Sequence, residues 1–278
     1  MKKISRRSFL AAAGLSVAAL ALTACGGSAS SVASSVASSA SSAAASTSAA
    51  AGELTTVEAG KLTMATNAAF PPYEMTTDAG DFEGIDIETA QAIADKLGLE
   101  LQIDDMDFDA ALLSVQQGKA DIVMAGVTVT DERKAVMDFS DSYATGIQSI
   151  IVPEGSDIAS PDDLVDKKIG TQRGTTGYIY CSDDFGDENV VAYDDGLTAV
   201  QALNNGQVDA VVIDNAPAQE FVAANPGLKI LDTSYAEEDY AIGMAKGSSL
   251  EDAVNAALKE LKADGTLQSI VDKYITAE

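Results

Sequence analysis

The sequence predicts an α/β fold made of two similar lobes, and three observations support this prediction. Short apolar runs alternate with helical patterns over residues 53–278, which is typical of α/β proteins with largely parallel strands. Residues 111–125 resemble residues 199–213, with alanine, glycine, aspartate and valine recurring 88 positions apart. Hydrophobic residues make up 46% of the chain, enough to bury a core. Each copy reads as a helix, a glycine stop and a buried strand, so we expect two lobes with a cleft between them.

The predicted elements follow from hydrophobic periodicity and from the residues that start and stop helices. Period-two or continuous apolar runs predict strands over residues 61–66, 99–103, 121–125, 168–171, 190–193, 209–213 and 240–245. Apolar residues at helical spacing predict helices over residues 86–97, 109–117, 175–182, 197–204, 216–224, 250–263 and 267–274. The string Ser248-Ser249-Leu250-Glu251 predicts a capping box, and Gly265 should end the helix that follows it.

Composition excludes several classes of protein. The chain holds 17 Lys and Arg against 43 Asp and Glu, and a net charge of −26 disfavours nucleic acid as a partner. It has no histidine, which removes Ser-His-Asp triads, Cys-His pairs and His-ligated zinc. Phosphate-loop and nucleophile-elbow motifs are missing from the sequence. The acidic run at residues 105–109 lacks the glycine and glutamate of a calcium loop, so we expect neither a metal nor a cofactor.

The first 52 residues are expected to serve export and anchoring. Residues 1–24 hold four cations and then an apolar run too short to span a bilayer, which predicts a signal peptide. The string Leu22-Thr23-Ala24-Cys25 resembles a lipobox, in which Cys25 carries the lipid; a secretory signal with a chance cysteine is the alternative. Residues 25–52 hold the lipidated cysteine and a Ser/Ala-rich tether. Two arginines in the signal leave the general and the twin-arginine export routes open.

Removal of the signal makes the remaining charges more informative. It takes away four cations and no acid, which deepens the net charge from −26 to −30. Arg133 is one of two arginines that remain, and it follows a predicted strand end, where clefts form. Its guanidinium could bind a carboxylate, or it could pair with Asp131 or Glu132 on the surface. Cys181, the remaining cysteine, is expected to be a buried and inert thiol.

Other polar and aromatic residues also fall at expected cleft edges. A predicted helix begins at Thr175 or Thr176, where free N–H groups would favour an anion or would be satisfied by a local cap. Asp214 ends an apolar strand and could meet an ammonium group or cap the next helix. Phe70 and Phe108 lie on predicted loops, where they could flank a ligand or pack in the core.

Together these segments resemble the family 3 solute-binding proteins, the amino-acid receptors of bacterial ABC importers. The resemblance covers residues 61–275, and its motifs occur in the family's order. They are ATNAAFPPYE, GIDIETAQAIADKLG, AGVTVTDERK, MDFSDSY, GTQRGTTG, QVDAVVIDNAP and DYAIGMAKG. The resemblance implies a periplasmic-binding-protein type II-like fold with two lobes on hinge strands. Lobe 1 would comprise residues 53–148 plus 242–278, and lobe 2 residues 149–241.

The resemblance also implies the groups that would bind an amino acid. It assigns the α-carboxylate to the arginine and to hydroxyl or amide groups, the α-ammonium to an acid and a backbone carbonyl, and the side chain to aromatic walls. The groups for the α-carboxylate match Arg133, Thr128, Thr175 and Thr176. Those for the α-ammonium match Asp214 and Gly126, and the aromatic walls match Phe70 and Phe108. Asn67 stands where relatives that bind cationic side chains resemble one another in having Asp, and Gln172 where some glutamine binders have Lys. These two positions favour a neutral polar amino acid.

The function expected from the sequence is therefore that of a receptor without catalytic activity. The protein would be a monomer anchored by the Cys25 lipid on the extracytoplasmic face of the cell membrane. It would close its two lobes on an amino acid and deliver that amino acid to an ABC permease. The alternatives are an amino-acid sensor or adhesin without transport, and a dehydratase-like enzyme on the same fold.

Overall fold

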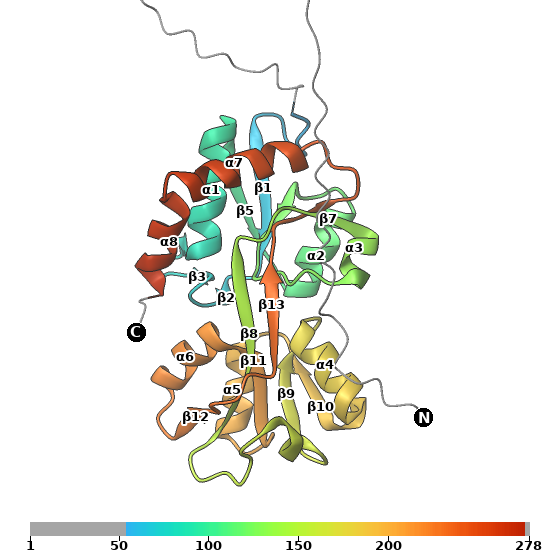
Figure 1. Ribbon diagram of the computed structural model, residues 1–278, viewed down its shortest axis with the longest axis vertical. Helices are drawn as coiled ribbons and strands as arrows, with labels where there is room; N and C mark the ends of the chain where they lie inside the picture. The colour runs from blue at the N-terminus through green and yellow to red at the C-terminus, as the bar shows by residue number, and fades with distance from the viewer. Residues whose placement is uncertain (1–53, 276–278) are drawn as a thin grey trace, which may run out of the picture. The chain divides into compact units, whose positions relative to one another are not determined.

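The computed structural model describes residues 54–275, which form two mixed β-sheets covered by helices (Figure 1). The predicted signal peptide, Cys25 and the tether lie outside the described residues.

The first sheet has the strand order β5-β1-β6-β14-β7. Its strands are β1 (Lys61–Thr66), β5 (Glu100–Asp105), β6 (Ile122–Val123), β7 (Met137–Phe139) and β14 (Gly243–Ala245). The helices of this lobe are α1 (Ile85–Leu97), α2 (Phe108–Gln116), α3 (Asp131–Val136), α7 (Glu251–Ala263) and α8 (Thr266–Tyr274). The C-terminal helices α7 and α8 pack on α1, so the end of the chain returns to the lobe that its beginning builds. A small sheet of β2 (Ala69–Phe70), β3 (Glu74–Thr76) and β4 (Phe82–Glu83) adjoins them.

The second sheet has the order β10-β9-β11-β8-β12, with β13 paired to β8. Its strands are β8 (Ala144–Pro153), β9 (Ile169–Gln172), β10 (Val190–Tyr193), β11 (Ala210–Asp214), β12 (Leu228–Ile230) and β13 (Ala236–Tyr240). Its helices are α4 (Thr176–Phe185), α5 (Gly196–Asn204) and α6 (Asn215–Ala224), with short 3₁₀ turns at Pro161–Leu164 and Asp187–Asn189.

Strands β8 and β13 cross between the two sheets. They pair antiparallel from Ala144↔Tyr240 to Gln148↔Ala236, and Figure 1 shows them side by side between the sheets. At the first sheet Ala241 N–H donates to the Val127 carbonyl (3.1 Å). The predicted two-lobed fold with hinge strands is confirmed. The residues that divide lobe 1 (53–148 plus 242–278) from lobe 2 (149–241) stay a prediction.

Three details of the sequence prediction are wrong. The sheets are mixed, because β8 and β14 run antiparallel to their neighbours. The single strand predicted over residues 240–245 is two strands, because Ala241 and Ile242 do not pair with β8. Their N–H groups donate instead to the Val127 carbonyl and the Ser140 hydroxyl. The capping box does not form: Leu250 holds the N-cap position of α7, and the Ser248 hydroxyl accepts from Leu250 N–H.

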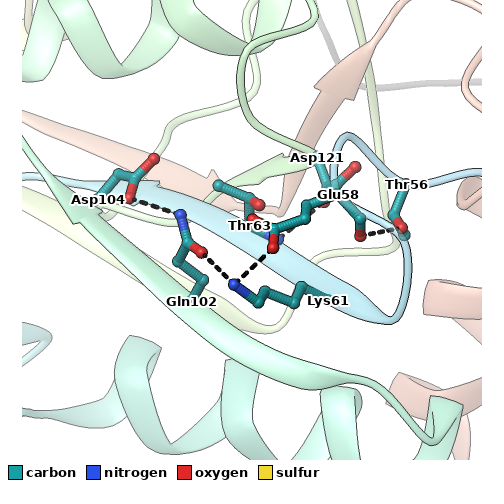
Figure 2. Close-up of polar contacts among 7 residues, drawn as sticks. All are labelled: Thr56, Glu58, Lys61, Thr63, Gln102, Asp104 and Asp121. Atoms are coloured by element: carbon teal, nitrogen blue, oxygen red, sulfur yellow. Dashed lines mark hydrogen bonds and ion pairs between the residues drawn. The ribbon is translucent and has the colours of Figure 1, made fainter.

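The two repeat copies have the same backbone geometry. Helices α2 and α5 end before glycines of left-handed conformation, Gly118 (φ 65°) and Gly206 (φ 67°). In each copy an aspartate then accepts a backbone N–H at 2.8 Å, Asp121 from Thr63 in β1 and Asp209 from Lys168 just before β9. Figure 2 shows the Asp121 contact beside the polar cluster around Lys61. The repeat therefore sets β6 and β11 in equivalent places of the two sheets.

Candidate functional site

A cavity lies between the two lobes and is lined by residues of both. Its volume is about 440 Å³, which includes the open solvent at its mouth. All ten ligand-binding residues predicted from the sequence line it: Asn67, Phe70, Phe108, Gly126, Thr128, Arg133, Gln172, Thr175, Thr176 and Asp214. Five further residues complete the wall: Glu74, Ala125, Gln148, Val212 and Ile213.

Arg133 enters the cavity from the first turn of α3, where the Thr130 hydroxyl accepts Arg133 N–H (3.2 Å) and so fixes the start of the helix. Arg133 is 9% exposed, and its guanidinium donates to the Thr128 carbonyl (2.8 Å) and the Gly174 carbonyl (3.1 Å). Its central carbon lies 5.4 Å from the Phe108 ring centroid. Burial lowers the pKa of Arg133 and Glu238 opposes this, but an arginine remains charged at neutral pH. The alternative of a surface pair with Asp131 or Glu132 is therefore wrong.

The start of α4 lies beside Arg133, whose guanidinium donates to the Gly174 carbonyl just before the helix. Thr175 is the N-cap, and its hydroxyl accepts Tyr178 N–H (3.3 Å), so the local cap does form. The Thr176 hydroxyl lies 3.5 Å from the Thr128 hydroxyl, which donates to Glu238 Oε2 (3.1 Å). A guanidinium, a hydroxyl pair and a helix N-terminus thus gather at one end of the cavity, an arrangement suited to a carboxylate.

Asp214 ends β11 and is 4% exposed. Its oxygens accept Ile147 N–H (2.9 Å) and Gln148 Nε2–H (2.8 Å). It makes no side-chain cap to α6, so the helix-cap alternative is wrong. Burial raises its pKa to about 7; the negative charge of Glu238 adds to this, while the Tyr240 hydroxyl and the two N–H donors oppose it. A buried carboxyl of this kind is ready to accept a cationic group.

Asn67 and Gln172 form an amide pair between the two sheets. Gln172 Nε2 donates to Asn67 Oδ1 (2.8 Å), and Asn67 Nδ2 donates to the Met106 carbonyl (3.0 Å). The aromatic wall is completed by Phe70, which stacks on Tyr73 with a centroid distance of 5.9 Å. These side chains add neutral polar and aromatic groups to the cavity wall.

Three acidic or amide residues were not predicted for the site. Glu74 is fully buried in the wall of the cavity, and its place four residues after Phe70 in FPPYE was the available signal. Gln148 lies in β8, a strand that the prediction missed, and its amide donates to both Asp214 and Glu238. Glu238 lies on β13 and is 6% exposed. It contacts Thr128 and Gln148 behind the cavity wall, a role that only the tertiary pairing reveals.

Over residues 54–275 no three metal-ligating side chains come together as a candidate metal site. None of the helices described for this chain combines the length and the apolar character needed to cross a membrane.

Comparisons with known proteins agree with this geometry. The model of the bacterial extracellular solute-binding proteins, family 3, matches residues 62–277. A probable histidine-binding protein of Neisseria gonorrhoeae is 32% identical over 275 residues, covering 96% of this chain and 95% of the relative. The L-cystine-binding protein TcyJ of Escherichia coli K12 is 33% identical over 226 residues, covering 80% and 85%.

Solved structures show the same similarity. The arginine-, lysine-, histidine-binding protein ArtJ of Geobacillus stearothermophilus superposes with a TM-score of 0.75 at 34% identity, covering 78% of this chain and 96% of that one. An ancestral arginine-binding protein bound to glutamine gives a TM-score of 0.75 at 41% identity, covering 78% and 99%.

Proposed function

Because this chain belongs to the bacterial extracellular solute-binding proteins of family 3, we propose that it is a receptor that binds an α-amino acid in the cavity between its lobes. The observation that carries the proposal is that one cavity is lined by a buried cationic group, the Arg133 guanidinium, and a buried acidic group, the Asp214 carboxyl. An amino acid zwitterion presents the matching pair of charges. Relatives whose names specify histidine, cystine, arginine or glutamine binding support the class of ligand.

Each end of the zwitterion has its own set of groups. The α-carboxylate takes N–H donors from Arg133 with the Thr176 hydroxyl and the start of α4, and the α-ammonium donates to Asp214 and the Gly126 carbonyl. Hydrogen bonds to charged groups contribute about 1.5–3 kcal/mol each. Five such bonds allow micromolar binding, about −8 kcal/mol, after the cost of ordering the ligand and the lobes.

The finer parts of the function extend the sequence prediction. The receptor is held at the extracytoplasmic face by the Cys25 lipid and acts as a monomer without catalysis. It passes its amino acid to an ABC permease after closing about β8 and β13. A neutral polar side chain is the preferred cargo, because the Asn67–Gln172 amide pair offers a donor and an acceptor there without a full charge.

Calorimetric titration of the purified protein with the twenty amino acids tests this proposal. At least one of them should bind with a micromolar or lower Kd. The Arg133→Ala variant should lose most of that affinity while it stays folded. A folded wild-type protein that gives no heat with any amino acid would refute the function, and cationic amino acids bound more tightly than neutral ones would refute the side-chain preference.

A further inference from the structure

Two carboxyl groups lie side by side, and one of them, that of Glu74, belongs to the cavity wall. Glu74 begins β3 and Asp86 lies in the first turn of α1, and both side chains are fully buried. Asp86 Oδ2 accepts Gly126 N–H (3.0 Å) and the Tyr143 hydroxyl (2.7 Å). Apart from one another, Asp86 Oδ1 and both Glu74 oxygens have no hydrogen-bond partner, and the two side chains hydrogen-bond to each other. Two touching carboxyl groups can form that bond only if one of them carries a proton.

The surroundings decide which carboxyl holds the proton. Asp86 accepts two donors that stabilise its ionised form, whereas Glu74 has only Asp86 beside it. Burial raises the pKa of Glu74 well above its ordinary value, and the negative charges of Asp86, Asp105 and Asp214 raise it further. The pKa of Asp86 is raised to about 6 by burial, against the effect of its donors from Gly126 and Tyr143. At neutral pH Glu74 is therefore the acid and Asp86 the carboxylate.

The residues that Asp86 holds belong to the cavity and to the crossing strands. Gly126 lines the cavity in a left-handed turn (φ 55°), and a Cβ there would lie 2.9 Å from Phe70 Cε1. Tyr143 directly precedes β8, and its N–H donates to the Tyr240 carbonyl of β13 (2.9 Å). One carboxylate oxygen thus fixes the Gly126 peptide and anchors the entrance of both crossing strands.

We propose that Asp86 is a positioning residue for ligand binding, which holds the Gly126 N–H and thereby fixes the turn from which the Gly126 carbonyl faces the ligand, and that Glu74 supplies the proton between the two carboxyl groups. The proposal rests on the proposed function for its ligand step. Glu74 acts on the ligand site through Asp86: without a donor at Oδ1, Asp86 would have a bare buried oxygen and would leave its place.

Four single variants test the proposal. Glu74→Gln keeps a donor toward Asp86, whereas Glu74→Met keeps the length of the side chain and removes the donor. Asp86→Asn replaces one acceptor oxygen by a donor. Asp121→Asn is the matched control, because Asp121 is also a buried aspartate of the first lobe that accepts two backbone N–H groups, one from Val57 and one from Thr63. Asp121 and Thr63 are drawn in Figure 2. Asp121 is not among the residues that line the cavity.

The ligand-free protein is measured first, by carboxyl ¹³C and amide exchange NMR. At pH 7 the Glu74 carboxyl should show the shift of a protonated acid. The Gly126 amide should exchange at least tenfold faster in Asp86→Asn and Glu74→Met than in the wild type, Glu74→Gln or the Asp121→Asn control. An ionised Glu74, or equal exchange in Glu74→Gln and Glu74→Met, would overturn the shared proton whatever the ligand is.

Titration with L-glutamine and with L-arginine follows. Affinity for the amino acid that binds should fall at least tenfold in Asp86→Asn and in Glu74→Met, with Glu74→Gln at least fivefold tighter than Glu74→Met. Asp121→Asn should lower the Tm and leave the Kd within threefold. Wild-type affinity in Asp86→Asn would overturn the positioning role. If neither amino acid binds the wild type, the ligand preference fails, and the NMR results still decide whether Asp86 holds Gly126.

Discussion

The substitution Asp214→Asn should make the ligand-free protein more stable and remove its affinity for an amino acid. Asp214 is 4% exposed, and burial raises its pKa from 3.8 to about 7. Between these two values the native protein keeps a proton that the unfolded chain releases, so the free energy of unfolding falls as the pH rises through this window. By pH 8 the ionised carboxylate costs about 4 kcal/mol.

The variant removes that charge but loses part of its hydrogen bonding. Asparagine can still accept Ile147 N–H, whereas its amide nitrogen would face the Gln148 Nε2 donor that the carboxylate now satisfies. A buried donor left unsatisfied costs about 1–3 kcal/mol. The net gain in the free energy of unfolding at pH 8 is therefore about 1–3 kcal/mol. Loss of the ion pair with the ligand ammonium should weaken binding by about 3 kcal/mol, or more than 100-fold.

Urea unfolding of the ligand-free wild type and variant at pH 5 and pH 8 gives the decisive comparison. The variant should be the more stable protein at pH 8, and its advantage should shrink toward pH 5, where wild-type Asp214 is protonated. The affinity of the wild type for its ligand should have the opposite pH dependence to its stability. It should fall as the pH drops below about 7, because Asp214 then takes up a proton. A stability difference that does not change with pH, or a variant that binds like the wild type, would refute the reasoning.

Three further predictions concern single residues. Arg133→Lys keeps the charge but not the two-pronged donor, and its Kd should rise by about 10–100-fold in calorimetry; a change below threefold would contradict the assignment. Gly146→Ala would place a Cβ 2.5 Å from Tyr240 Cζ and 2.7 Å from Asp214 Oδ1, and urea unfolding should show a loss of about 2–3 kcal/mol. Cys181 is buried with a pKa raised to about 12, so a thiol reagent should label it only after unfolding; rapid labelling of the native protein at pH 8 would show that the thiol is accessible.

The sequence predicts best those elements whose side chains obey local rules. The bounds of β1 and β10 coincide with their prediction, because each is an apolar run with turn residues close to its ends. Strand β8 was missed because it carries Gly146 and the buried, polar Gln148, whose amide is satisfied only by carboxylates of β11 and β13. The residues next to Gln148 in the sequence give no sign of these carboxylates, which lie far along the chain.

The same distinction separates the site residues that were predicted from those that were not. Arg133 and Asp214 could be placed on the cavity because each closely follows or ends a buried strand, where the edges of two lobes meet. Glu74 could not be predicted for the site, because a buried acid needs a partner such as Asp86, which only the folded chain brings beside it. Glu238 follows from the pairing of β8 with β13, which sequence spacing does not contain.

The internal repeat explains why a cavity between two similar lobes can still orient its ligand. At the offset of 88 residues, Gly126 and Asp214 are equivalent positions, and both line the cavity, Gly126 shortly after β6 and Asp214 at the end of β11. One lobe offers a backbone carbonyl and the other a carboxylate, two acceptors that suit one ammonium group. Arg133, in contrast, is equivalent to Phe221, which packs in the hydrophobic core of the second lobe. The cation therefore exists in one copy only, and this asymmetry gives the proposed zwitterion a single direction in the cleft.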